Sequence, residues 1–168
     1  MTAASDTPTD APRRDRNAEK RARSAAARLY AVQALFQMEA AGTSADRVQT
    51  EFRKFRIGAE HDGETAPEAD ETLFTGIVDD AVTWQGRIDQ ATDQALVERW
   101  PIDRIDPVLR ALFRAAGAEL IAPRTPPRVV ISEYVGLADA FFPEGREPKF
   151  VNAVLDHMAR ALRPADMA

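Results

Sequence analysis

Apolar residues recur at helical spacing through most of the chain, and prolines and glycines divide this pattern into short segments. Near the start, Leu29, Val32 and Phe36 lie three or four positions apart among alanines, which places their side chains on one face of a helix. No segment shows the sustained alternation of apolar and polar residues that is typical of a half-buried strand. The sequence therefore predicts an all-α bundle of about seven helices.

Caps and helix breakers predict where these helices begin and end. Ser44 is placed to cap the second helix, and Asp106 with Pro107 forms a start signal, an Asp at the cap followed by a Pro at the first helical position. An exposed acidic loop is expected over residues 58–67, where apolar periodicity is interrupted. From the apolar stripes the helices are expected over residues 19–41, 44–55, 73–84, 107–121, 130–141 and 148–163. A helical stretch from residue 88 up to Trp100 and Pro101 either continues the third of these helices or follows it as a separate one.

A chain of 168 residues is long enough for one compact domain or for two small subdomains that share a core. Residues 1–18 lack apolar periodicity and contain Pro8 and Pro12, so this basic extension is expected to be disordered. The helical domain is expected over residues 19–164, with approximate subdomains at 19–67 and 68–164 and a tail at 165–168.

The composition excludes several kinds of chemistry. The chain has no cysteine, which excludes disulfides, thiolate metal sites and a cysteine nucleophile, and a reducing cytoplasm is the expected compartment. It shows no signal peptide and no apolar run long enough to span a bilayer. His61 and His157 are its only histidines, and no catalytic motif or glycine-rich phosphate loop is present. We expect neither catalysis nor a bound cofactor or metal.

Charge is distributed unevenly along the chain. Residues 11–28 hold seven basic side chains against two acidic ones, a charge of +5, whereas residues 29–168 carry −8. A basic arm on an acidic body is typical of a protein that touches a polyanion at one place only. A solvated, disordered tail would give the same pattern, and the composition does not decide between the two.

Residues 149–156, with the sequence KFVNAVLD, combine an apolar stripe with a polar edge on the last helix. Lys149 and Asn152 belong to that edge and Phe150 lies beside it, at a point where a proline-bounded loop enters the helix. An aromatic ring next to a cation and an amide can hold an unstacked base and a phosphate. A packed terminal helix with a solvated face is the alternative reading of the same residues.

Three segments together resemble the bacterial transcription antitermination factors of the NusB family, a resemblance that covers residues 21 to 162. They are residues 28–36 (RLYAVQALF), 129–133 (VVISE) and 149–156 (KFVNAVLD), in the order in which the family has them. The resemblance implies a non-catalytic, all-helical protein of two small subdomains. It also implies binding to the single-stranded boxA element of nascent ribosomal RNA transcripts together with NusE, the small ribosomal subunit protein S-ten. Other Nus factors and RNA polymerase would be indirect partners.

The same resemblance assigns roles to individual residues. Phe36 and Glu119 correspond to positions on the partner surface, although Phe36 replaces a tyrosine of the family and Ala118 replaces another beside Glu119. Phe150 either contacts RNA or anchors the helix in the core. The expected RNA contacts are Arg21, Arg23, Arg28, Arg146, Lys149, Phe150 and Asn152.

Two other interpretations remain open at this stage. Ribosomal RNA methyltransferases carry a NusB-like helical region, so the chain could be such an accessory domain without its catalytic part. It could also be a protein-only adapter whose basic arm is inert. The sequence does not distinguish a monomer from a homodimer.

Overall fold

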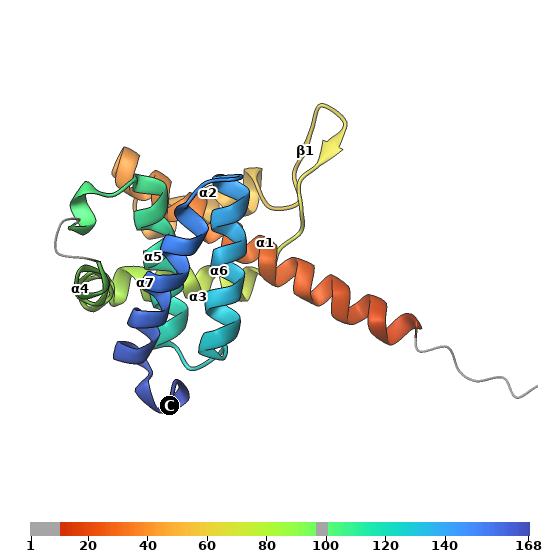
Figure 1. Ribbon diagram of the computed structural model, residues 1–168. Coiled ribbons are helices and arrows are strands. Elements are labelled where there is room, and N and C mark those ends of the chain that lie inside the picture. The colour runs from red at the N-terminus through yellow and green to blue at the C-terminus, as the bar shows by residue number, and fades with distance from the viewer. Residues whose placement is uncertain (1–10, 97–100) are drawn as a thin grey trace, which may run out of the picture.

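The computed structural model describes residues 11–96 and 101–168, and within them it confirms the all-α prediction (Figure 1). Seven α-helices account for nearly all of the regular structure of these residues. In chain order the elements are α1 (Ala11–Ala41), α2 (Ala45–Phe55), β1 (Glu60–His61), β2 (Glu64–Thr65), α3 (Glu71–Thr83), α4 (Gln85–Ala95), the 3-10 turn η1 (Ile102–Arg104), α5 (Pro107–Ile121), α6 (Pro127–Phe141), α7 (Glu147–Leu162) and the 3-10 turn η2 (Pro164–Asp166).

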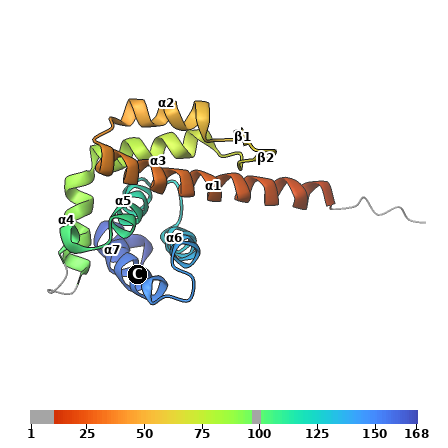
Figure 2. The ribbon, with the colours of Figure 1, turned by 90° about the horizontal axis from the view of Figure 1, so that it is seen from above.

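The helices form two layers. Figure 2 shows α1, α2 and α3 lying alongside one another, with α5, α6 and α7 packed beneath them and α4 at one end. Helix α5 is the central helix of the bundle. It packs against α1, α3, α4, α6 and α7. Its small residues permit this close packing: a side chain at Gly117 would collide with Ile88 of α4. A single buried apolar cluster runs through all of these helices.

Local caps set several helix boundaries as the sequence predicts. The Ser44 side chain accepts a hydrogen bond from the Arg47 backbone N–H at 3.3 Å, and Asp106 accepts one from the Val108 N–H at 2.7 Å. Each bond satisfies a donor that the first helical turn would otherwise leave unpaired. These two starts were predictable because a cap and its partner are neighbours in sequence.

At both ends of the predicted domain, the structure differs from the prediction in detail. Helix α1 begins at Ala11 and not near residue 19, so residues 11–18, expected to be disordered, are helical; residues 1–10 lie outside the described part. Pro12 does not prevent this, since proline is tolerated in the first helical turn. At the other end, the expected tail folds back as η2 and buries Met167, which is 4% exposed.

The acidic loop is exposed as predicted but contains a small antiparallel hairpin. Strand β1 pairs with β2 through the register Glu60 to Thr65, and Asp62 and Gly63 form the turn with φ angles of 51° and 82°. Two successive positive φ angles define the tight hairpin turn that Asp-Gly favours. The dipeptide was therefore a hairpin signal that the helical interpretation overlooked.

The expected subdomain boundary after residue 67 stays a prediction. Helix α3, the first element beyond it, packs against α1 and α2 on one side and α5 on the other. None of the helices described here is both long and apolar enough to cross a membrane.

Candidate nucleic-acid interface

The N-terminal part of α1 projects beyond the rest of the molecule (Figures 1 and 2). Every side chain from residue 13 to residue 23 is exposed, and burial of α1 begins only after that. We call residues 11–23 the basic arm. Arg21 and Arg23, two of the predicted RNA contacts, lie on it with exposed side chains. A backbone hydrogen bond of 3.1 Å from Asp70 N–H to the Arg23 carbonyl fastens the base of the arm to the start of α3.

The structure places Arg28 in the interior, which corrects its assignment as an RNA contact. Its Nε and Nη2 donate to the two carboxylate oxygens of Glu119 on α5 at 2.8 and 3.0 Å. Arg28 is 5% exposed and Glu119 is 3% exposed. Glu119 is therefore also misassigned, because it faces Arg28 and not a partner. A two-bond pair of this kind, removed from water, satisfies charges that would otherwise be costly to bury.

Three neighbours complete this cluster at the contact of α1, α5 and α6: Tyr134 is buried, and Thr125 and Glu133 are partly exposed. Thr125 Oγ1 donates to Glu119 at 3.3 Å, and the Glu133 carboxylate lies 3.9 Å from Arg28. The Tyr134 hydroxyl is buried and has no hydrogen-bond partner among the residues that the structure describes. Burial raises the pKa of Tyr134 well above its usual value, and the nearby Glu119 carboxylate raises this pKa further. The cluster holds α1 in place where the arm leaves the body.

Sequence reasoning did not identify this cluster. The available signal was a tyrosine inside an otherwise apolar face, since a buried phenol usually needs a polar neighbour. The partner could not be named, because Arg28 and Glu119 are 91 positions apart.

The start of α7 presents the second group of predicted RNA residues. Lys149 and Asn152 are exposed and, three positions apart, lie on the same face of the helix. Arg146 is exposed at the cap of α7. Phe150 is partly buried and meets the Phe113 ring edge to face, with centroids 6.1 Å apart. Packing against the core is thus the role that the structure gives Phe150.

The basic arm and the start of α7 belong to different helices, each of which packs against α6. They form two exposed groups, one in which cations outnumber the two carboxylates of Asp15 and Glu19 and one that combines cations with the amide of Asn152. Both groups are available for contact with a large ligand.

Phe36 stands beside an apolar groove between the two layers. Its side chain is 39% exposed, and the groove, with a volume of about 400 Å³, is lined by Val32, Phe52, Val108 and Phe141 among others. The guanidinium of Arg56, a further lining residue, lies 5.1 Å from the centre of the Phe52 ring. An exposed ring at the edge of an apolar groove is a suitable anchor for another protein.

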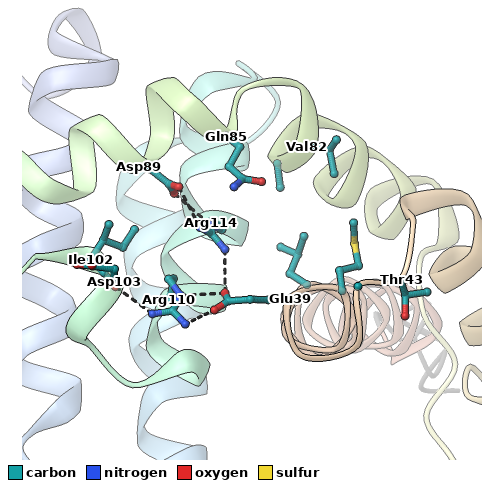
Figure 3. A pocket seen from close by; sticks show the side chains of 13 residues that line it. Glu39, Thr43, Val82, Gln85, Asp89, Ile102, Asp103, Arg110 and Arg114 are labelled. Atoms are coloured by element: carbon teal, nitrogen blue, oxygen red, sulfur yellow. Dashed lines mark hydrogen bonds and ion pairs between the residues drawn. The ribbon is translucent and has the colours of Figure 1, made fainter.

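A hollow of about 650 Å³ near the C-terminal end of α1 contains a chain of ion pairs (Figure 3). The Glu39 carboxylate accepts from Arg110 Nε at 2.8 Å and from Arg114 Nη1 at 2.9 Å. Arg114 also donates to both Asp89 oxygens at 3.1 and 3.0 Å, and Arg110 Nη1 donates to the Ile102 carbonyl at 3.1 Å. Since both guanidinium groups are bonded to protein oxygens, we assign this chain to holding α1, α4 and α5 together and not to binding phosphate.

Fold and surface together define an all-helical protein that carries a basic helical arm on an acidic body. The family model described as the NusB family matches residues 25–160. The chain therefore belongs to the NusB family.

Curated relatives are similar over nearly their whole length. The chain is 47% identical to the transcription antitermination protein NusB of Maricaulis maris over 140 residues, which cover 83% of this chain and 87% of that protein. It is also 47% identical to the NusB protein of Brucella melitensis biotype 1 over 153 residues, covering 90% of this chain and 87% of the relative.

A crystal structure of the antitermination factors NusB and NusE in complex with double-stranded RNA contains a chain of the same fold. The TM-score is 0.64 at 26% sequence identity, and the match covers 82% of this chain and 96% of the other.

Proposed function

We propose that this protein is a non-catalytic transcription antitermination factor that binds boxA-type single-stranded RNA of nascent ribosomal RNA transcripts together with NusE. The observation that carries the proposal is an exposed, basic helical arm on an otherwise acidic member of the NusB family. Local positive charge attracts a polyanion to one part of the surface while the acidic body keeps it from the rest. Suppression of premature termination in the cytoplasm would follow from this binding.

Two exposed groups would share the RNA. Arg21 and Arg23 supply cations for phosphates at the base of the arm, and Lys149 and Asn152 offer a cation and an amide at the start of α7. Arg146 adds a further exposed cation at the α7 cap. Single-stranded RNA is recognised by such a combination, because phosphates need cations and exposed base edges need hydrogen-bonding groups.

Phe150 supports this surface by packing underneath the exposed side chains at the start of α7. Its edge-to-face contact with Phe113 fixes the first turn of α7, so the exposed side chains on either side of it are held in place. We assign Phe150 to shaping the RNA surface and not to stacking on a base.

The Phe36 groove is the surface that we assign to NusE. An exposed phenyl ring beside an apolar groove fits the apolar part of a protein interface better than it fits a phosphate chain. NusE bound there would leave the arm accessible. Contacts with other Nus factors and RNA polymerase would then be made through the RNA–NusE complex.

An anisotropy titration tests the proposal. A labelled boxA-like strand and a scrambled strand of equal length are each titrated with the protein, with and without NusE, over a salt series. If about four phosphates are neutralised, the logarithm of the affinity falls with the logarithm of salt at a slope near −3.

Tighter binding of the boxA strand in the presence of NusE is the expected result. Equal binding of both strands with NusE present would refute RNA recognition. NusE binding without any RNA binding would identify a protein-only adapter. Methyl transfer to RNA by the purified chain would instead favour the methyltransferase alternative, against which the antitermination names of the relatives already weigh.

A further inference from the structure

Helix α2 ends in four successive exposed side chains, those of Arg53, Lys54, Phe55 and Arg56. Phe55 is 62% exposed, the highest value for a large apolar side chain among the described residues. Cations are favourable here, because they lie at the negative end of the helix dipole. The phenyl ring of Phe55 has no such role, and it leaves apolar surface in water. The stability of α2 therefore does not explain this exposed ring.

Helix α2 is also a positive site on an acidic body. Residues 45–56 hold four basic side chains against two acidic ones, a charge of +2, whereas residues 29–168 together carry −8. Both carboxylates are compensated locally. Asp46 lies in the first turn, at the positive end of the helix dipole. Glu51 accepts a hydrogen bond from Gln37 at 2.8 Å and lies 3.8 Å from Arg56. The charge that α2 offers to another molecule is therefore positive.

Two of its cations have no partner. The exposed side chains of Arg47 and Lys54 make no hydrogen bond or ion pair with any residue that the structure describes. They are seven positions apart, so they lie on the same face of α2 and about 10 Å apart along its axis. Both line a hollow of about 440 Å³ that Phe55 also lines. We call Arg47, Lys54 and Phe55 with this hollow the outer face of α2.

The helix that carries this face is fixed against α3. Phe52 stacks on Phe74 with ring centroids 5.7 Å apart, and Arg53 donates a hydrogen bond to Thr75 Oγ1. The guanidinium of Arg56 lies over the Phe52 ring and covers it. The backbone beneath the outer face is thus already in place, which lowers the entropic cost of binding a partner.

A protein segment fits this face better than a nucleic acid does. The acidic hairpin lies beside it, since the His61 ring is 3.3 Å from the Phe55 carbonyl oxygen and Glu60 and Asp62 are exposed on either side of that histidine. Carboxylates so close repel a continuous row of phosphates. A protein can instead place single carboxylates opposite the two cations and an apolar side chain against the ring.

We propose that the outer face of α2 is a docking surface for an acidic segment of another protein. The segment would carry two carboxylates about 10 Å apart, opposite Arg47 and Lys54, and an apolar side chain against Phe55. None of these three residues belongs to the basic arm, the start of α7 or the Phe36 groove. The proposal is therefore independent of RNA and NusE binding, and a partner on α2 leaves both of those surfaces accessible.

Nuclear magnetic resonance of the ¹⁵N-labelled full chain tests the proposal. The probe is a synthetic, alanine-based helical peptide with two glutamates seven positions apart, each followed by a leucine. A second peptide has glutamine in place of both glutamates, and a boxA-like RNA strand is the third ligand. Shifts of backbone amide signals report which residues each ligand contacts, and a titration gives its affinity. We expect the acidic peptide to shift the amides of residues 43–56.

The variant R47Q/K54Q removes the two unpaired cations. It should bind the acidic peptide about fivefold more weakly or worse, because two charge contacts are lost, and the difference should shrink as salt is added. The control R87Q/R104Q removes two exposed cations from α4 and η1, and it should bind as the native chain does.

The variant F55A removes the exposed ring, and it should weaken the acidic peptide to a similar extent because the leucine loses its contact. Its control is V82A, which shortens another exposed apolar side chain, 45% exposed, on α3, and which should leave the affinity unchanged. Circular dichroism checks that every variant keeps its helical content.

Three results would overturn the proposal. The first is an acidic peptide that shifts no amide of residues 43–56. The second is equal binding of the glutamine peptide, which would show that the charges of α2 take no part. The third is an RNA strand that shifts these amides as strongly as the acidic peptide does, which would assign the face to nucleic acid.

Discussion

Replacing Glu119 with glutamine removes the negative charge of the buried pair while hardly changing side-chain volume. Arg28 then keeps a full positive charge in a site where its side chain is 6% exposed. Of the two bonds that Arg28 makes to Glu119, at 2.8 and 3.0 Å, the glutamine oxygen can accept one, whereas the NH2 group cannot accept the other. Removing one partner of a buried pair costs about 3 to 5 kcal/mol, because the remaining charge is desolvated and uncompensated.

Urea unfolding followed by far-ultraviolet circular dichroism measures this cost. At an m-value of about 2 kcal/mol per molar, the midpoint should fall by roughly 1.5 to 2.5 M in E119Q. The double variant R28M/E119L should recover most of the loss, since apolar residues of similar size often replace a buried pair without penalty. The matched control is D156N, which removes a carboxylate from the exposed pair with Arg160, and it should cost less than about 0.5 kcal/mol.

If the urea midpoint falls no further in E119Q than in D156N, the reasoning is refuted. It would mean that the Arg28 site is hydrated in solution and that the pair does not fasten α1 to α5. A double variant less stable than E119Q would contradict the account in another way, by showing that the cluster cannot be replaced by apolar packing.

Three further predictions concern other parts of the molecule. The guanidinium of Arg110 lowers the pKa of Glu39, so the Glu39 contribution to the free energy of unfolding is present above about pH 4.5 and is lost as the pH falls through the lowered pKa. The urea midpoints of the native chain and E39Q should therefore converge in acid. Burial raises the pKa of Tyr134, so above about pH 10 the unfolded state ionises first and stability falls, by up to about 1.4 kcal/mol per pH unit, and Y134F should flatten this decline in urea unfolding. For the partner surface, F36A should weaken NusE binding about tenfold or more by calorimetry, whereas V129A, a comparably exposed position at 44%, should leave it unchanged.

The parts of the fold that follow from neighbours in sequence were predictable. Ser44 and Asp106 cap helices because their bonding partners lie two or three positions away. The basic arm shows the limit of such reasoning, since Pro8 and Pro12 suggested disorder where arginine, lysine, alanine and glutamate sustain a helix. The Asp62-Gly63 turn was equally local, and it was missed because a helical pattern dominated the chain.

Site residues were harder to place, because their roles depend on distant partners. In the sequence, Arg28 is one more cation of a basic segment. Only the structure shows that it is bonded to Glu119. Phe150 lies beside the apolar stripe of its helix, and only the position of Phe113 shows which way its ring packs. Arg21 and Lys149 are exposed as expected, but exposure permits RNA contact without demonstrating it.

Photo-crosslinking tests the central claim most directly, namely that RNA lies on the basic arm and the start of α7. A boxA-like strand carrying 4-thiouridine is irradiated with the protein and NusE, and the crosslinked peptides are mapped by mass spectrometry. The account predicts crosslinks at residues 13–23 and 146–152, with none in the buried cluster around Arg28. Crosslinks confined to α3 and α4, with both predicted groups unlabelled, would contradict it.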